Sequence, residues 1–565
     1  MIEFPPGLIL ILGALPVPFL RGPLRAIWLL ALPVAAFALL YSLPNGDHFA
    51  VAAFGQELQL LRVDALSKVF GYVFLIAIFL GVIYALHLRA VEEHIAGLVY
   101  AGAAIGAVFA GDLISLFVYW ELTAISSVFL ILARRTPEAL AASMRYLIIQ
   151  VGSGVLLLAG LIVRWHETGS IEFTHIGIDG AGGELILLAF GIKAAFPLLH
   201  NWMQDAYPKA TPTGAVLLSA FTTKLAIYAL ARGYAGTEEL IWIGATMAAF
   251  PIFFAVIEND LRRVLSYSLN NQLGFMVVGV GIGTDLALNG AAAHAFTHVL
   301  YKALLFMSMG AVLHRTGTAL ASELGGLYKS MPFTTVFCII GAASISAFPL
   351  FSGFISKAMI LSATAHEGHF WVWLVLLFAS AGVFHYSGIK IPYFAFFAKD
   401  SGKRPAEAPW NMLVAMALAA ILCVGIGVWP SALYAILPFE VDYIPYTDSH
   451  VLSQVQLLFF SALAFMVLIR TGLYPAQMRS TNLDTDWLYR RVGHSILQYA
   501  ARAADNVHSD VYDLVVRRAR RFVDQLYKHH GPQGIIARTW PTGSMVLWVA
   551  ILLVSYLVLY FLDIF

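Results

Sequence analysis

The chain repeats apolar runs that are long enough to cross a lipid bilayer. They start near residues 6, 25, 69, 95, 113, 146, 185, 214, 240, 264, 286, 332, 370, 411, 452 and 544. A membrane-spanning helix needs about 20 apolar residues, and lipid excludes open strands and irregular backbone. The sequence therefore predicts an all-α polytopic membrane protein with about sixteen transmembrane helices.

Composition supports this class and excludes others. Of 565 residues, 60% are hydrophobic and only 12% are charged, whereas soluble domains carry about 25% charged residues. A net charge of +1 argues against nucleic acid as a partner. Cys338 and Cys423 both lie in apolar runs and are too few for an iron–sulfur cluster or a disulfide framework. No phosphate-binding or dinucleotide motif is present, so we expect no cofactor and no metal. Met1–Leu20 reads as a first span rather than a signal peptide.

Basic residues alternate between successive loops. Loops after odd-numbered spans hold fifteen lysines and arginines, Lys390 among them, and loops after even-numbered spans hold four: Arg62, Lys68, Arg164 and Arg232. Cytoplasmic loops carry the excess of positive charge. The pattern predicts an external N-terminus and a cytoplasmic segment before the last span. We expect a multi-pass protein of a prokaryotic inner (plasma) membrane.

A basic segment follows the fifteenth span. Within Leu483–Arg538, apolar residues recur at helical spacing among nine basic ones, namely at Val511, Leu514, Val515, Phe522 and Leu526. This pattern predicts an amphipathic helix on the cytoplasmic membrane face. It could bind lipid headgroups or brace this subunit or a neighbour. Met545–Phe565 then forms a last span.

A short internal echo points to a repeat. Ala195–Leu198 reads Ala-Phe-Pro-Leu, and so does Ala347–Leu350. The copies fall in the seventh and twelfth spans, and an odd separation of five gives them opposite orientations, as in inverted-repeat transporters. A proline within a span breaks the helix and frees a backbone carbonyl. We expect both helices to be broken.

Titratable residues lie inside several apolar runs. His294, His298 and Lys302 are four residues apart and share one face of a helix. A charge at mid-membrane costs on the order of 3 kcal/mol on insertion scales, so such residues rarely persist without a task. Histidines titrate near neutral pH and can relay protons. Metal or haem ligation by His294 and His298 is the alternative, but no further ligand is evident.

Four more apolar runs repeat this situation. They contain Glu121, Lys193, Lys224 and Lys357, and burial makes lysine a usable proton carrier. A glutamate–lysine pair in low dielectric forms a switch, because separating the pair changes the proton affinity of the lysine. Each lysine could instead be a structural partner of a carbonyl or carboxylate. His200 and Asp205 lie where the seventh helix would end, as a proton entry or as plain loop residues.

Together these motifs resemble the antiporter-like membrane subunits of Mrp sodium/proton antiporters and respiratory complex I. The resemblance covers roughly residues 60–480, its core looks most like the D-type Mrp subunit, and the tail resembles the lateral helix of complex I. The matching motifs are Phe117–Leu122, Lys193 with Pro197–Trp202, Asp260–Ser268, His294–Phe306 and Pro349–Phe354 followed by Lys357.

The resemblance implies two inverted five-helix repeats with broken helices 7 and 12. It divides the chain into helices 1–3 (1–94), a first repeat of helices 4–8 (95–235), a second of helices 9–13 (236–400), helices 14–15 (401–482), the amphipathic helix (483–540) and a last span (541–565). It further implies that Glu121 and Lys193 form a coupling pair. Lys224 and the His294–Lys302 stripe would relay protons laterally, and Lys357 would guard an exit.

Three functions fit these residues. The first is the proton-translocating subunit of a multi-subunit monovalent cation/proton antiporter, with sodium as the expected cation and other membrane subunits as partners. The second is a proton-pumping subunit of a redox complex, such as NADH:quinone oxidoreductase or a membrane hydrogenase. The third is the membrane subunit of a bicarbonate-accumulating pump. The chain itself would hold no cofactor in any of them, so its sequence leaves the choice open.

Overall fold

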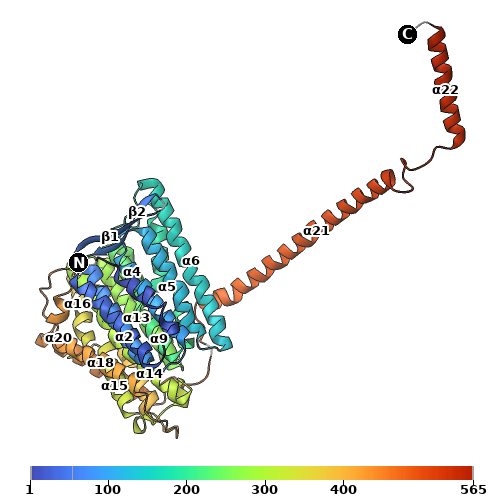
Figure 1. Ribbon diagram of the computed structural model, residues 1–565. Helices are drawn as coiled ribbons and strands as arrows, with labels where there is room; N and C mark the ends of the chain where they lie inside the picture. The colour runs from blue at the N-terminus through green and yellow to red at the C-terminus, as the bar shows by residue number, and fades with distance from the viewer. Residues whose placement is uncertain (1–2, 54, 481, 563–565) are drawn as a thin grey trace. The chain divides into compact units, whose positions relative to one another are not determined.

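The computed structural model describes residues 3–53, 55–480 and 482–562 (Figure 1). The chain divides into two compact units, Met1–Asn482 and Leu483–Phe565. The larger unit is a helix bundle with one small β-hairpin.

The larger unit begins with a first group of helices and the hairpin. They are α1 (Pro6–Gly13), η1 (Val17–Phe19), α2 (Gly22–Ser42), β1 (Gly46–Ala53), β2 (Gln56–Val63), α3 (Ala65–Ala85), α4 (Val91–Phe109), α5 (Leu113–Leu132), α6 (Pro137–Thr168), α7 (Gly183–Ala194), α8 (Asn201–Ala206), η2 (Tyr207–Lys209), α9 (Pro212–Ala220) and α10 (Thr222–Gly233).

A second group of helices completes this unit. They are α11 (Glu238–Ala249), α12 (Pro251–Ile257), α13 (Leu261–Ile282), α14 (Asp285–Thr316), η3 (Ala321–Glu323), η4 (Leu327–Lys329), α15 (Pro332–Ile345), α16 (Ser352–His366), α17 (Phe370–Val383), η5 (Phe384–Lys390), η6 (Tyr393–Phe397), α18 (Trp410–Val428), α19 (Ser431–Tyr434) and α20 (Asp448–Arg470).

The helical, membrane-spanning character predicted from the sequence is confirmed. Among the described residues, twelve helices are long and apolar enough to cross a membrane. The four other predicted spans correspond to α1, α7, α13 and α15. Three of these are short, with 8, 12 and 14 residues, and α13 has 22 residues but carries many polar side chains. The count of sixteen stays a prediction, since these four helices are shorter or more polar than the other twelve.

The hairpin is an element that the sequence did not predict. Strands β1 and β2 pair antiparallel, from Gly46 opposite Val63 to Ala53 opposite Gln56. Figure 1 shows the hairpin at one end of the bundle. Its edge joins the start of α5, because Gln59 N–H donates to Asp112 Oδ2 (2.7 Å) and Gly111 N–H to Gln59 O (2.8 Å). The hairpin thus caps an end of the bundle and leaves the spanning segments helical.

Helices α13 and α14 form the centre of the bundle. The most apolar stretch of α14 is 94% buried, and the helix contacts α3, α9, α13, α15, α16 and α18. On α13, the side chains of Asn270, Asn271 and Gln272 are fully buried. Buried polar groups need hydrogen-bond partners, so the centre of this protein is polar as well as packed.

Two helices are interrupted where the sequence predicts breaks. Helix α7 ends at Ala194 and α8 begins at Asn201, and likewise α15 ends at Ile345 and α16 begins at Ser352. The backbone is left-handed at Ala195 (φ 62°) and Leu198 (φ 70°). It is left-handed again at the matching residues of the second copy, Ala347 (φ 56°) and Leu350 (φ 72°). Non-glycine residues rarely adopt this conformation, so the two copies of the motif share an unusual backbone conformation as well as their sequence.

A third interruption was not predicted. The eighth predicted span is split into α9, ending at Ala220, and α10, starting at Thr222. Phe221 sits between them with φ −99° and ψ −67°. Since no proline lies there, the run looks continuous in sequence.

The smaller unit consists of two long helices and a short π-helical turn. The turn η7 (Leu488–Gly493) leads into α21 (His494–His530), and α22 (Thr542–Phe561) follows. Helix α21 carries six of the nine basic residues of the predicted amphipathic segment, and α22 is apolar and long enough to span a membrane.

Candidate functional site

Lys193 at the end of α7 reaches across to α5 beside Glu121. Its side chain is fully buried, and Nζ donates to the carbonyl of Trp120 (2.5 Å) and to Thr123 Oγ1 (2.9 Å). The ammonium also lies 4.3 Å from the centre of the Trp120 ring, a favourable cation–π contact. The lysine is thus bound to the backbone and side chains on either side of Glu121.

The Glu121 carboxylate is held against a glycine of α6. A Cβ at Gly154 would lie only 1.4 Å from Glu121 Oε1, so any side chain there would displace the carboxylate. This oxygen is buried without a protein hydrogen-bond partner in the described part of the chain. Glu121 and Lys193 lie close enough for their charges to interact. The structure therefore brings together the two residues of the predicted coupling pair.

Polar side chains cover the backbone exposed by the first break. Asn270 of α13 donates to Ala195 O (2.6 Å), and Trp202 Nε1 of α8 donates to Ile192 O (2.9 Å). Interrupting a helix leaves carbonyls without their usual partners, and these two bonds replace them. The break is held in place by its neighbours.

Lys224 lies just after the unpredicted break. Its Nζ donates to Ser219 O (2.5 Å) and to Thr223 Oγ1 (3.3 Å), and the residue is fully buried. The carbonyl of Ser219 belongs to the last turn of α9, so the lysine binds the end that the break exposes. Helices α7 and α10 pack against each other, which places Lys193 and Lys224 on neighbouring helices.

The predicted stripe on α14 is entirely buried. His294 Nδ1 is hydrogen-bonded to Ser356 Oγ of α16 (3.0 Å). Both ring nitrogens of His298 and Nζ of Lys302 are buried without a protein partner among the described residues. Tyr301 OH donates to Gln272 Oε1 of α13 (3.2 Å). This face of α14 is therefore polar inside the packed bundle.

Lys357 joins this stripe from the second break. Its Nζ donates to Ile345 O (3.0 Å), the last carbonyl of α15, and lies 5.2 Å from the Phe275 ring centre. Lys224, His294, His298, Lys302 and Lys357 are all buried, and α14 packs against both α10 and α16, which carry Lys224 and Lys357.

The two residues considered for proton entry lie at the far end of the first break. Asp205 of α8 is buried and accepts a hydrogen bond from Arg145 Nε (2.7 Å). His200 is also buried, with its ring 4.5 Å from that of Phe250. Neither is a loop residue in solvent, because both lie against neighbouring helices.

The count of loop charges wrongly placed Lys390 in a loop. It ends the π-helical segment η5, is fully buried, and donates to the carbonyls of Ala255 (3.1 Å), Val256 (2.8 Å) and Glu258 (2.6 Å). These carbonyls are at the end of α12. The flanking residues Gly388, Ile389, Ile391 and Pro392 are uncharged, which was the available signal of burial.

Two other polar residues were missed by sequence reasoning. Gln150 of α6 is fully buried, and neither atom of its amide has a protein partner in the described part of the chain. It lies one turn before Gly154, which contacts Glu121. Glu93 of α4 accepts hydrogen bonds from Thr211 and Thr213 (2.8 Å each). Gln150 interrupts an apolar run, the same signal that identified the lysines, whereas Glu93 lies between Glu92 and His94 and gives no such signal.

The assembled site consists of buried groups that can each carry a proton. Lys224 and Lys357 bind carbonyls at helix interruptions, and Lys302 has no protein partner among the described residues. Among the described residues, no cluster of three or more histidine, cysteine, aspartate or glutamate side chains could hold a metal ion. The arrangement suits proton transfer through water and side chains.

Comparison with known proteins places the chain in a family. Residues 110–426 match the family described as "NADH:quinone oxidoreductase/Mrp antiporter, TM". The chain is 33% identical over 316 residues to the D-type Na(+)/H(+) antiporter subunit of Alkalihalophilus pseudofirmus, covering 52% of this chain and 64% of that protein. It is 28% identical over 418 residues to hydrogenase-4 component B of Escherichia coli, covering 64% and 61%.

A solved structure extends the likeness in fold. The chain matches a chain of the membrane-bound sulfane sulfur reductase, an archaeal respiratory membrane complex, with a TM-score of 0.71 and 20% identity. The match covers 98% of this chain and 100% of that one. The chain spans less than two thirds of the length of the two relatives named above, and 40% of the A/B-type subunit of a probable K(+)/H(+) antiporter in Rhizobium meliloti.

Proposed function

The chain belongs to the NADH:quinone oxidoreductase/Mrp antiporter family of membrane subunits, and from this premise we propose that it is the proton-translocating subunit of a multi-subunit monovalent cation/proton antiporter. Sodium is the proposed cation. The other subunits are further membrane proteins, in a prokaryotic plasma membrane. The basic tail helix lies on the cytoplasmic face, and the N-terminus lies outside.

One observation carries this proposal: the set of buried proton carriers at helix interruptions. Lys193 binds Trp120 O next to Glu121, Lys224 binds Ser219 O, and Lys357 binds Ile345 O. A lysine that donates to a carbonyl is stabilised in its charged form. If it moves away from that carbonyl in a hydrophobic setting, it loses this stabilisation and releases its proton more readily.

In this mechanism, Glu121 controls when the Lys193 amine releases its proton. While the carboxylate is near Lys193, it favours the protonated amine, and when it turns away the amine releases its proton toward Lys224. The proton then passes along the buried face of α14 to Lys357. An incoming cation that attracts or displaces the Glu121 carboxylate would drive this step.

A second function rests on a separate observation. The relative in Escherichia coli is a hydrogenase component, and the fold matches a chain of a respiratory complex over nearly its whole length. The same proton carriers could serve a redox complex, with electron transfer in soluble partner subunits as the driving reaction. The chain would act in the same way in both settings.

Co-purification separates the two functions. The chain, tagged and isolated from its native membrane in gentle detergent, is analysed with its partners by mass spectrometry. An antiporter predicts membrane subunits alone, and iron–sulfur or flavin subunits would instead support the redox complex. The antiporter also predicts sodium-dependent proton movement in vesicles that contain the isolated assembly.

A further inference from the structure

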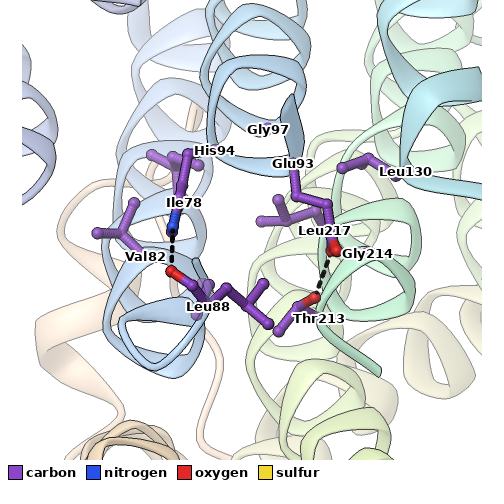
Figure 2. A pocket seen from close by; sticks show the side chains of 12 residues that line it. Ile78, Val82, Leu88, Glu93, His94, Gly97, Leu130, Thr213, Gly214 and Leu217 are labelled. Carbon is purple, nitrogen blue, oxygen red and sulfur yellow. Dashed lines mark hydrogen bonds between the residues drawn. The ribbon is translucent and has the colours of Figure 1, made fainter. Parts of the chain in front are cut away.

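A water-sized cavity lies where α4 begins, between α3, α4 and α9. Its volume is about 20 Å³, which is roughly the space of one water. Figure 2 shows the Glu93 carboxylate and the Thr213 hydroxyl joined on one side, and His94 directed to the Leu88 carbonyl on the other. Apolar side chains that include Ile78, Val82, Leu130 and Leu217 line the rest.

Glu93 of α4 is a buried carboxylate that lies beside the start of α9. It is 9% exposed, and Oε2 accepts hydrogen bonds from the hydroxyls of Thr211 and Thr213, each at 2.8 Å. Thr211 also caps α9 by accepting from Gly214 N–H (2.9 Å). The carboxylate is therefore fixed against the helix whose continuation carries Lys224. None of these residues belongs to the set of proton carriers described above.

Leu217 follows one turn after Thr213, and its side chain packs closely against two glycines. A Cβ at Gly97 of α4 would lie 2.8 Å from Leu217 Cδ1, and a Cβ at Gly81 of α3 would lie 2.5 Å from Cδ2. Any side chain at either glycine would therefore collide with the leucine. Leu217 lines the cavity and is only 8% exposed. Of the α9 residues that line the cavity, Leu217 is the nearest in sequence to the break at Phe221.

Polar groups resume beyond this leucine. Tyr100 of α4 is hydrogen-bonded to Thr222 Oγ1 (2.5 Å) at the start of α10, and Lys224 follows two residues later. Glu93, Gly97 and Tyr100 are spaced four and three residues apart and so share one face of α4. The interface of α4 with α9 and α10 is polar at Glu93, apolar at Leu217 and polar again at Tyr100.

We propose that Glu93 takes up protons for Lys224 and that Leu217 is the gate between them. When the Leu217 side chain moves away from the two glycines, water molecules connect the Glu93 carboxyl group to the Tyr100–Thr222 pair and to Lys224. The protonated carboxyl group then gives its proton to the neutral amine, and the carboxylate takes another from solvent. Closure of the gate prevents the proton from flowing back. This inference rests on the proposed function.

The test measures passive proton flux through the whole assembly. Vesicles that contain it carry a pH dye, and a potassium diffusion potential drives protons across the membrane. Leu217→Ala and Leu217→Asn should each raise the flux several-fold, because one removes the plug and the other makes it polar. Adding Glu93→Gln to Leu217→Ala should return the flux toward the wild-type rate, because the amide cannot carry the proton.

Matched control variants test whether a substitution raises the proton flux only because it disturbs the packing of the protein. Leu218→Ala alters a fully buried leucine of the same helix outside the cavity and should leave the flux unchanged. Leu217→Met keeps an apolar side chain of similar size and should therefore leak fewer protons than Leu217→Asn. If Leu217→Ala does not assemble, the comparison of these two variants tests the gate. Equal flux in Leu217→Ala, Leu217→Asn and Leu218→Ala would overturn the gate.

A separate readout distinguishes failure of the gate from failure of the proposed function. Cation-driven proton transport is measured in the same vesicles with Lys193→Ala. If that variant is inactive while the Leu217 variants do not leak, the gate is wrong and the proposed function stands. If the wild-type assembly shows no cation-driven proton transport, the proposed function itself fails, and the gate falls with it.

Discussion

The two helix breaks share a backbone but place their lysines differently. Both contain Ala-Phe-Pro-Leu with left-handed alanine and leucine. In the first break Lys193 precedes the turn and donates across to the Trp120 carbonyl of α5. In the second, Lys357 follows the turn and donates back to Ile345 O of its own broken helix.

Ile345 makes the difference visible in sequence. It lies two residues before Ala347, just as Lys193 lies two residues before Ala195. The second copy thus has an apolar residue where the first has a lysine, and its own lysine binds the carbonyl of that apolar residue. The lysine of the first break thus joins two helices beside Glu121, whereas the lysine of the second break binds the helix on the other side of its own break. On the proposed function, the first break is the coupling point and the second is a relay point.

The largest effect is expected at the coupling point. Glu121→Gln keeps the shape beside Gly154 but removes the charge that acts on Lys193. Positioned proton-transfer groups contribute about 100-fold or more to rate, so we expect driven proton transport to fall by that order. The measurement is the initial rate of pH change in vesicles that contain the assembly. Glu138→Gln, at an exposed glutamate on α6, is the control and should transport normally.

Lys357→Met should have a smaller effect on transport and a larger one on stability. The variant leaves the Ile345 carbonyl without its bond, and an unpaired buried carbonyl costs about 1 to 3 kcal/mol of unfolding free energy. Transport should fall at least about 10-fold. Thermal unfolding in detergent and vesicle transport measure the two effects. Lys329→Met, at an exposed lysine, serves as the control, and a fully stable Lys357→Met would contradict the contribution of this hydrogen bond to stability.

A symmetrical effect is expected when the backbone is changed. Valine at Ala195 or at Ala347 would have to adopt φ near 62° or 56°. A β-branched residue held in the left-handed region costs on the order of 1 to 3 kcal/mol, so both variants should lose similar stability. Unfolding in detergent measures both, with Ala194→Val as the helical control. A large difference between the two would mean that the breaks are not equivalent in backbone.

Gln150→Leu should have the smallest effect. Its amide is buried near Glu121 without a protein partner in the described part of the chain. Replacing such a group with an apolar one is neutral or stabilising by up to about 1 kcal/mol. Transport should fall a few-fold, because water around the Glu121 carboxylate loses a partner. A variant that is both less stable and fully active would contradict this assignment.

Much of the fold was predictable because lipid imposes simple rules. The apolar runs are helical, several of them in two pieces, and Pro197 and Pro349 marked two of the breaks, since proline cannot supply a helical N–H. The break at Phe221 has no proline. The short strands beside Phe49 and Gln59 give a weak pattern, and only their docking on Asp112 explains them. These features depend on partners distant in the sequence.

The site was predictable to the extent that charge is rare in apolar runs. Lys193, Lys224 and the α14 stripe were found because each breaks such a run. Lys390 was misplaced because counting loop charge cannot tell a loop lysine from one that binds carbonyls of another helix. Which carbonyl each lysine binds was not accessible to sequence, since Trp120 is 73 residues away from Lys193.

The most direct test of this account is the proton flux of the assembly with Lys193→Ala. The complex is purified from its native membrane, placed in vesicles, and given a sodium pulse while internal pH is followed. We predict that the variant inserts and co-purifies normally, because losing a buried charge lowers the cost of insertion, yet moves no protons above background. Wild-type proton movement in a correctly assembled Lys193→Ala complex would contradict the central role of the first break.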